Sequence, residues 1–244
     1  MPYDAAMTQR DDAASDLRTD LVQNLRTCRD VEREVFGALD PHDRDAPPAD
    51  GGWSAKDDLA HLSAWRQRQA NVMVARREGR AKPALPAVDI NETNGLFHAE
   101  RADWSWAKVD ADADATADAL IAEIVAAGDE TLADMEVIAS LMGDGPEHDL
   151  AHLARIAEIV GLGARVVELA SLAEAMIDRG GWPSRSAAFG RYNLACFHAL
   201  AGRLDIARSL LRQALPVEEE LRSLAPTDDD LMALRDEIPS LIGP

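Results

Sequence analysis

Cysteine and aromatic residues are scarce in this sequence. Only two of its 244 residues are cysteines, Cys28 and Cys196, and they lie far apart in apolar segments. Two isolated cysteines exclude a disulfide framework and a cysteine-type zinc motif, so we expect each to be a small buried residue rather than a nucleophile. Aromatic residues make up 5% of the chain, while alanine, leucine, aspartate and arginine dominate, and this composition favours helix over sheet.

Basic residues are also few relative to acidic ones. The chain has 25 Lys and Arg against 44 Asp and Glu, which gives a formal net charge of -19 at pH 7. Nucleic acid and anionic membranes attract proteins through a surface rich in Lys and Arg, so neither partner is expected here. Acidity of this kind keeps proteins dissolved and monomeric or weakly associated, and a homodimer is left open.

Long apolar runs are missing as well. No segment approaches the roughly 20 apolar residues that a membrane-spanning helix needs. The first residues, MPYDAAMTQRDD, have neither the basic start nor the apolar stretch of a secretory signal, and we therefore expect a cytoplasmic protein. The sequence also has no glycine-rich phosphate loop and no Gly-x-Ser-x-Gly motif, which excludes two common classes of enzyme.

Helical periodicity is what the sequence does contain. Over residues 15–39 apolar side chains recur at every third or fourth position, which predicts one amphipathic helix. Residues 40–52, DPHDRDAPPADGG, are predicted to form a loop. Ser54, with Asp57 three residues later, is close to a capping box, so a second helix is expected from there to about residue 77.

Two more helices complete a predicted bundle. Residues 80–105 are irregular, apart from a short helical pattern in DINETNGLFHAE. A third helix is predicted over residues 116–141, with Gly128 as a weak point inside it. A fourth helix begins at Pro146, because proline suits the first helical position. Four helices with a long second connection and no strand-like alternation predict an all-α four-helix bundle over residues 15–160.

The character of the sequence changes after about residue 161. Helices are predicted over residues 164–178, 187–201 and 206–215. The last two resemble a tetratricopeptide unit, although His198 stands where the repeat usually has tyrosine. Small and large residues fall at the spacing of its signature positions: Leu194, Ala195, His198, Gly202, Ala207, Leu211 and Ala214. The tail, TDDDLMALRDEIPSLI, resembles segments that close repeat proteins. Residues 161–244 are therefore predicted to form a tetratricopeptide-like helical extension.

Three histidines are predicted to face the interior of the bundle. On a helical wheel His148 and His152 share a stripe with Ile156 and Ile159, and His61 shares one with apolar residues of the second helix. A buried imidazole needs a partner for each ring nitrogen, and a metal ion is one such partner. Three nitrogen ligands and an open position suit catalytic zinc. The alternative is three ordinary polar residues at the edge of a core, since spacing alone does not show that the rings converge.

Carboxylates lie close to these histidines in the sequence, at Asp57, Asp58, Glu147 and Asp149. One of them is placed to fix the tautomer of a ligating ring by a hydrogen bond to its second nitrogen. No residue stands out as a general base.

Several other aromatic and ionisable residues are expected to have structural rather than catalytic or metal-binding roles. Trp104 and Trp106 flank the long connection and either roof a pocket or anchor a loop, and the second is favoured. His98 is expected to be an exposed loop histidine rather than an acid or base, and His42 to be solvated. The acidic run at residues 110–118 is expected to be the solvated start of a helix, because it lacks the glycine and final glutamate of a calcium loop.

Two motifs of this chain resemble signatures of the DinB superfamily. GWSAKDDLAHLSAW, at residues 52–65, is similar to the signature of its second helix, and HDLAHL, at residues 148–153, is similar to the ligand pair of its fourth helix. The segment VDINETNGLFHAE resembles the connection in the DfsB-like branch. The resemblance implies a four-helix bundle that binds a metal ion, and by transfer of the motifs the metal ligands are His61, His148 and His152.

The same resemblance implies an activity. Superfamily members include thiol-dependent S-transferases and isomerases that use mycothiol or bacillithiol. We therefore expect a metal-dependent enzyme that detoxifies or processes a small electrophilic molecule, by transfer of a low-molecular-weight thiol such as mycothiol or by hydrolysis. The cofactor would be a divalent metal ion, zinc in the first place and nickel as the alternative, which lowers the pKa of a bound thiol or water.

A non-catalytic adaptor is the competing hypothesis. In that case the bundle is a scaffold, and the tetratricopeptide-like segment binds a protein partner. A single repeat unit cannot bury its own faces, so it must stack on the bundle or on another chain. An open coordination position that faces a pocket would favour the enzyme, and a closed or empty site would favour the adaptor.

Overall fold

The protein is helical throughout the part of the chain that its computed structural model describes. This part comprises residues 3–47, 52–143, 145–179 and 183–242, with side chains from residue 17 onward. No strand occurs in these ranges, so the predicted all-α class is confirmed. None of the helices in them is both long and apolar enough to cross a membrane.

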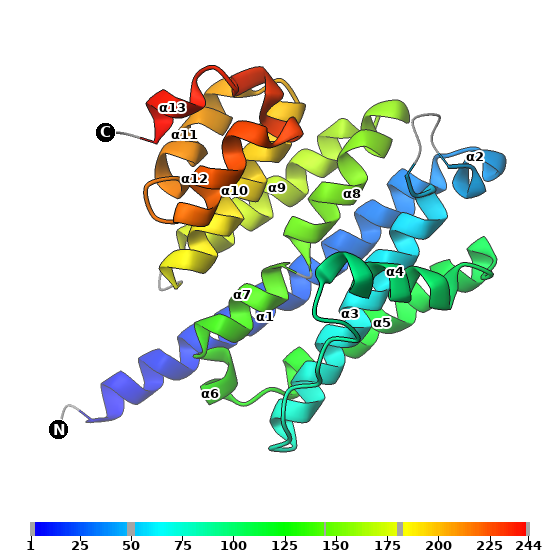
Figure 1. The fold of residues 1–244 in the computed structure, drawn as a ribbon. Helices are drawn as coiled ribbons and strands as arrows, with labels where there is room; N and C mark the ends of the chain where they lie inside the picture. The colour runs from blue at the N-terminus through cyan, green and yellow to red at the C-terminus, as the bar shows by residue number, and fades with distance from the viewer. Residues whose placement is uncertain (1–2, 48–51, 144, 180–182, 243–244) are drawn as a thin grey trace.

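Four long helices form a bundle (Figure 1), and these are α1 (Tyr3–Gly37), α3 (Ala55–Arg77), α5 (Trp106–Ala126) and α8 (Pro146–Ile159). α3 packs against α5 and α8, and α1 packs against the same two helices. The first, second and fourth predicted helices are therefore present, although α1 begins well before residue 15. The capping box that starts α3 is complete, because Ser54 and Asp57 each bind the backbone N–H of the other.

The predicted loop after α1 contains a short helix. α2 spans Pro41–Asp45, and Asp40 caps it by accepting a hydrogen bond of 2.9 Å from the backbone N–H of His42. Proline at the first helical position and a capping aspartate are local helix-start signals, and they outweigh the loop-like composition of the segment. Residues 48–51 of the predicted loop lie outside the described part.

The predicted third helix over residues 116–141 is wrong in extent, because the chain forms α5, α6 (Asp129–Leu132) and α7 (Met135–Gly143) there. α5 ends where Ala127 turns to an extended conformation, with φ -64° and ψ 137°. Gly128 then caps the start of α6. The glycine identified as a weak point is therefore where the helix stops.

α5 also begins ten residues earlier than predicted, because its acidic start is held by cations of α1. Asp110 and Asp114 both bind the guanidinium of Arg29, a side chain that is almost fully buried. Between them Ala113 lies in the core. The run is therefore the start of a helix, as predicted, with Asp110 and Asp114 43% and 42% exposed beside Arg29 and with Ala113 in the core.

A short helix covers part of the bundle. α4 spans Ile90–Arg101, packs on α3 and is capped by Asp89. It corresponds to the short helical pattern predicted inside the otherwise irregular connection between the second and third bundle helices. The long second connection of the predicted bundle is thus present, with α4 as its ordered centre.

The remaining elements stack beside the bundle (Figure 1), and they are α9 (Gly163–Asp178), α10 (Ser184–Leu200), α11 (Leu204–Ala214), α12 (Glu219–Leu224), η1 (Ala225–Thr227), η2 (Asp229–Leu234) and α13 (Ile238–Leu241). α9 packs on α8 and α1, and α10 packs on α8, α9 and α11. One cluster of buried apolar side chains runs from Leu21 of α1 to Leu241 of α13. The division at residue 160 is therefore crossed by a continuous core, and two domains stay a prediction.

α10 and α11 form the expected helical hairpin. Gly202 ends α10 in the left-handed region, with φ +70°, where a side chain would be strained. Leu194, Leu211 and Ala214 are buried, as the hairpin prediction requires. The tail covers this hairpin, because η2 contacts both of its helices. Identification of the hairpin as a tetratricopeptide unit stays a prediction.

Candidate metal centre

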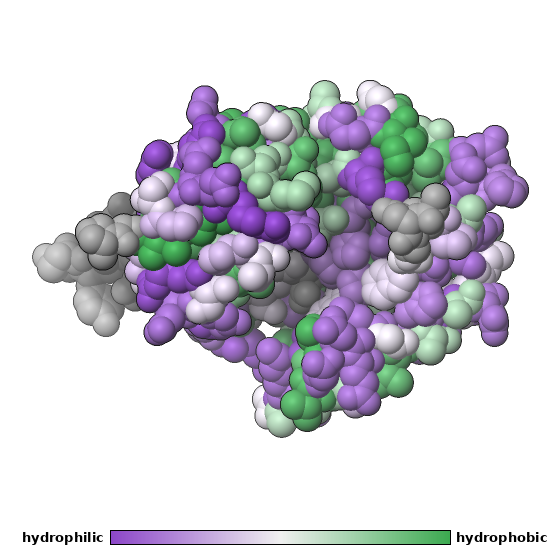
Figure 2. Space-filling view, turned by 45° about the horizontal axis from the view of Figure 1, so that its top comes forward, coloured by the Kyte–Doolittle hydropathy of each residue, from purple (hydrophilic) through white to green (hydrophobic). Residues whose placement is uncertain are grey.

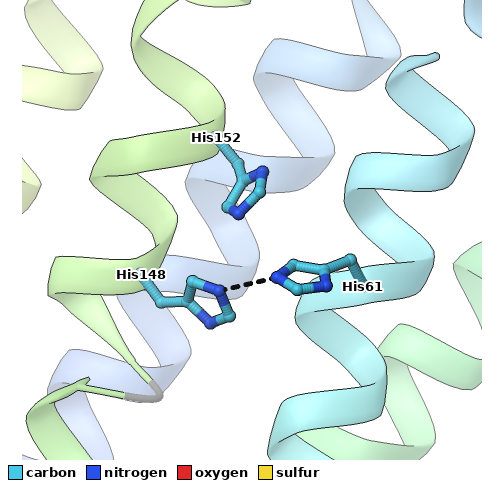
Figure 3. A group of neighbouring side chains, drawn as sticks. All are labelled: His61, His148 and His152. Atoms are coloured by element: carbon cyan, nitrogen blue, oxygen red, sulfur yellow. Dashed lines mark hydrogen bonds between the residues drawn. The ribbon is translucent and has the colours of Figure 1, made fainter. Parts of the chain in front are cut away.

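Three imidazole rings converge between α3 and α8 (Figure 3). His61 comes from α3, and His148 and His152 come from successive turns of α8. One nitrogen from each ring can be chosen so that all three lie within 4.8 Å of one another. The Nε2 atoms of His61 and His148 are 2.9 Å apart. The three residues that the sequence singled out therefore form one group that could hold a metal ion.

Burial keeps two of these rings neutral. His61 is 5% exposed, and its burial, followed by the proximity of His152, lowers its pKa to about 3. Burial also lowers the pKa of His148 well below its ordinary value, and His152, His61 and Arg66 act in the same direction. A neutral imidazole offers a lone pair, so both rings are in the form that binds metal ions.

The hydrogen bonding of the group is incomplete in a way that suits a cation. Between the Nε2 atoms of His61 and His148 only one proton can be shared, and the Nδ1 atoms of both rings are buried with no hydrogen-bond partner among the described residues. Buried polar groups normally have partners. An ion that accepts both Nε2 lone pairs replaces the poor N···N contact, so a divalent metal fits these residues.

Asp58 orients the third ring. Its Oδ1 atom lies 2.9 Å from Nδ1 of His152, across the interface between α3 and α8. The Nδ1–H of His152 donates to this carboxylate, which leaves its Nε2 free to face the other two rings. Asp58 is therefore the one among the four suggested carboxylates that contacts a histidine of the group.

The other three carboxylates have different partners. Asp57 belongs to the capping box of α3 and lies 3.3 Å from Nε2 of His98. Asp149 is fully buried and binds the guanidinium of Arg66. Glu147 faces α10, where the amide of Asn193 donates to it at 3.5 Å.

A buried ion cluster lies under the histidines. Nη2 of Arg66 is 2.6 Å from Oδ1 of Asp149 and also binds Glu32 of α1. All three side chains are at most 1% exposed, and Arg29 binds Glu32 as well. The cluster ties α1, α3 and α8 together beside the metal candidates. The cluster was not predicted from the sequence, although Glu32 stands four residues after Cys28 on the apolar stripe of α1, a position where a charge is unusual.

Trp53 packs against the histidine group, a role that was not predicted from the sequence. Its ring centroid is 4.7 Å from that of His61, and it stacks against His98 at 5.6 Å and against His152 at 6.3 Å. Trp53 immediately precedes the cap of α3, a position from which apolar residues commonly fold back on the first turn of a helix. That signal was available in the sequence.

The two tryptophans of the long connection serve as anchors, as favoured from the sequence. Trp104 lies beneath Lys108, with Nζ 3.6 Å from its ring centroid, and beside Arg101. Trp106 packs edge-on against Phe36 of α1. Neither ring makes an aromatic contact with the three histidines among the described residues, whereas Trp65 lies 6.3 Å from both His61 and His148.

The structure corrects two single-residue predictions and confirms a third. His98 is not an exposed loop histidine, because it lies on α4 and stacks on Trp53 with its side chain 35% exposed. Ile159 is 66% exposed, so the inward stripe of α8 stops at Ile156. His42 is solvated as predicted. The wheel misplaced Ile159 because it lies in the last turn of α8, beyond the edge of the bundle core.

Both cysteines are buried and free, as expected. Burial raises the pKa of the Cys28 thiol well above its ordinary value, with Asp149 adding to the effect. Burial and the nearby Asp228 raise the pKa of the Cys196 thiol. Neither side chain is therefore suited to act as a thiolate nucleophile.

Comparison with known proteins gives one result. The family model of the DinB superfamily matches residues 24–159, which is more than half of the chain and contains α3, α8 and all three histidines. No curated protein and no solved structure matches the chain.

Proposed function

The chain belongs to the DinB superfamily, and from this membership and its convergent histidines we propose that it is an enzyme in which His61, His148 and His152 hold a divalent metal ion. The observation that carries the proposal is the approach of three imidazole nitrogens within 4.8 Å, two of them on rings that burial keeps neutral. Zinc is the expected ion, because three nitrogen ligands with room for another ligand are typical of catalytic zinc, and nickel is the alternative.

The chain's own side chains would position the ligands and limit access of water. Asp58 holds His152 in one tautomer and one orientation through the 2.9 Å contact with its Nδ1. Trp53 forms an aromatic cover over His61 and His152, and His98 extends that cover by stacking on the Trp53 ring. A partly apolar cover suits a small organic substrate better than a highly charged one.

We propose a small electrophilic molecule as the substrate, attacked by the sulfur of a low-molecular-weight thiol or by water. The chemistry that a bound divalent ion supplies at such a site is a lower pKa for a coordinated thiol or water. The sulfur would come from a cosubstrate such as mycothiol, because Cys28 and Cys196 are buried with raised pKa values. Hydrolysis is the version of the same proposal that needs no cosubstrate.

Metal content is the first test. We expect the purified protein to hold one divalent ion per chain by elemental analysis, and the variants His61→Ala, His148→Ala and His152→Ala to lose it. The matched control is His42→Ala, which removes a histidine whose side chain is 88% exposed and should leave the metal content unchanged. A full complement of metal in all three site variants would refute the ligand set.

Activity is the second test. The metal-loaded protein is assayed with mycothiol, with cysteine and with no thiol, each against 1-chloro-2,4-dinitrobenzene and a series of activated esters. We expect turnover by the wild type and by His42→Ala, and turnover reduced to background by His152→Ala. Equal rates for wild type and His152→Ala, or no turnover in any pairing, would favour the non-catalytic adaptor, in which the helical extension binds a protein partner.

A further inference from the structure

A second concave site lies between α8 and the C-terminal helices, and His148 of the histidine group forms part of its wall. It is a cavity of about 380 Å³, walled by α8, α10, α12 and the start of η2. Figure 2 shows one face of the molecule, with hydrophobic and hydrophilic residues interspersed on it and a hollow near its middle, whereas the position of the cavity is given by its lining residues. The volume falls within the range of about 300–1,000 Å³ in which sites for small molecules are found.

Most of the cavity wall is apolar. Phe189 and Phe197 of α10 and Leu221 and Leu224 of α12 face it, together with Leu150 of α8. Leu224 is 45% exposed. An apolar wall of this size suits the hydrocarbon or aromatic body of an organic molecule, because burial of that body removes apolar surface from water.

The polar part of the wall contains three carboxyl groups together with His148, Tyr192, Asn193 and Cys196. Glu147 of α8 and Asp228 and Asp230 at the start of η2 line it, and the lining contains no Lys or Arg among the described residues. The carboxylates of Asp228 and Asp230 lie within 4.8 Å of each other and of the Cys196 thiol. Like charges at this separation repel each other, so a cation between them and Glu147 would be stabilised.

The hydrogen bonds inside the cavity do not neutralise this charge. Tyr192 donates to Oδ2 of Asp228 at 2.7 Å, and the thiol of Cys196 lies 3.8 Å from the same atom. Glu147 receives a long contact of 3.5 Å from the amide of Asn193. These donors are neutral groups, and a buried carboxylate is stabilised far more by an opposite charge than by a single long hydrogen bond.

Glu147 is brought to the cavity by the close approach of α8 and α10. A methyl group placed on Gly190 of α10 would lie 2.7 Å from Oε1 of Glu147. Glycine at this position therefore leaves the space that the carboxylate occupies. The acidic groups thus come from two separate parts of the chain, the bundle and the tail, and meet at one cavity.

We propose that this cavity binds an organic cation, a primary or secondary ammonium group attached to an apolar body. The ammonium group lies among Glu147, Asp228 and Asp230, and the apolar body lies against the phenylalanine and leucine wall. A bare metal ion fits less well, because the wall is mainly apolar and one carboxylate oxygen of Asp228 is already bound to Tyr192. None of the three carboxylates is a proposed metal ligand, but Glu147 directly precedes His148, and His148 also lines the cavity.

Calorimetric titration of the full chain with 2-phenylethylammonium chloride tests the proposal. We expect saturable binding of one molecule per chain that weakens as salt is added. The neutral analogue 2-phenylethanol and the anion phenylacetate should bind at least roughly tenfold more weakly, since each lacks the charge-assisted hydrogen bonds to the carboxylates. Equal binding of the alcohol, or no binding of the ammonium compound, would overturn the proposal.

Variants locate the binding site. Glu147→Gln and Asp230→Asn should each weaken binding of 2-phenylethylammonium, Glu147→Gln by roughly tenfold and the exposed Asp230→Asn by less. Asp229→Asn is the matched control, because this neighbouring carboxylate is 95% exposed, pairs with Arg235 and does not line the cavity. Asp230 is an exposed side chain, so its variant tests the site even if Glu147→Gln fails to fold.

Two further measurements distinguish this cavity from the histidine group and from a metal site. Binding of 2-phenylethylammonium should be unchanged in His152→Ala, and its loss there would assign the compound to the histidine group and overturn the proposal. Titration with Mg²⁺ or Zn²⁺ in the His152→Ala background should not displace the compound. Displacement by a metal ion that also requires Asp230 would identify the acidic pair as a metal site instead.

Discussion

Arg66 and Asp149 form an ion pair of 2.6 Å between the two helices that carry the histidines. Arg66 lies five residues after His61 on α3, and Asp149 directly follows His148 on α8. Both side chains are at most 1% exposed. Because the ion pair is buried and short, it fixes how α3 and α8 pack together. It therefore also fixes how the histidines on these two helices approach each other.

Replacement of Arg66 by methionine should destabilise the fold strongly. The variant leaves Asp149 and Glu32 buried without their cation, and such a loss costs about 3–5 kcal/mol. The measurement is the free energy of unfolding from urea denaturation. Arg33→Met is the control, since Arg33 is 49% exposed and its ion pairs contribute at most about 1 kcal/mol. Similar losses of unfolding free energy in the two variants would show that the buried cluster contributes no more to stability than exposed ion pairs do.

Replacement of Asp58 by asparagine should weaken metal binding without removing a ligand. The carboxylate holds Nδ1 of His152 at 2.9 Å, and loss of such an orienting partner lowers metal affinity by about 10- to 100-fold. Competition with a chromophoric chelator measures the affinity. Asp57→Asn tests the adjacent carboxylate, which caps α3 instead, and should leave the affinity close to that of the wild type. If both variants bind metal as the wild type does, Asp58 does not position the ring.

His198 should make the fold sensitive to acid. This ring is 4% exposed, and burial lowers its pKa below the ordinary 6.5, against the opposing hydrogen bond to Glu174. The unfolded chain therefore takes up a proton on His198 at a higher pH than the folded chain does. Stability is lost as the pH falls below 6.5, until the pH reaches the lower pKa of the folded state.

The test compares the wild type with His198→Gln, which keeps a donor for Glu174 but does not titrate. Between pH 7.5 and pH 5.5 the free energy of unfolding should fall less in the variant than in the wild type. His61 and His148 also have lowered pKa values, but they are present in both proteins and cancel in the comparison. In His42→Gln, where an exposed ring is lost, the pH dependence should match the wild type. If the free energy of unfolding of His198→Gln falls as much as that of the wild type, His198 is not the source of the acid sensitivity.

The C-terminal helices should be required for a stable bundle. α9 packs on α8 and α1, and its buried Leu169 and Ala173 belong to the same core as the bundle helices. A fragment of residues 1–160 therefore exposes an apolar surface, and we expect it to be less soluble and to bind a hydrophobic dye. Melting temperature and solubility are measured beside the full chain. A fragment as soluble and as stable as the full chain would instead support two independent domains.

The sequence by itself determined what depends on near neighbours along the chain. The spacing of His148 and His152 places them on one face of a helix whatever surrounds it, and the capping box at Ser54 fixes where α3 begins. The apolar stripe of the second helix also turned His61 inward, and the family motifs then grouped it with the pair on α8. The extent of the third helix was misjudged although its signal was local, because Gly128 was treated as a weak point and proved to be a cap.

Tertiary structure decided which of several equivalent residues meet. Asp57 and Asp58 are adjacent in sequence, but they point about 100 degrees apart on α3, and only the packing of α8 selects Asp58 for His152. Trp53 and the Arg66 cluster depend in the same way on contacts between helices far apart in the chain. Helix periodicity gives the direction of a side chain relative to its own axis, whereas contacts across helices depend on how the axes pack, which no local pattern encodes.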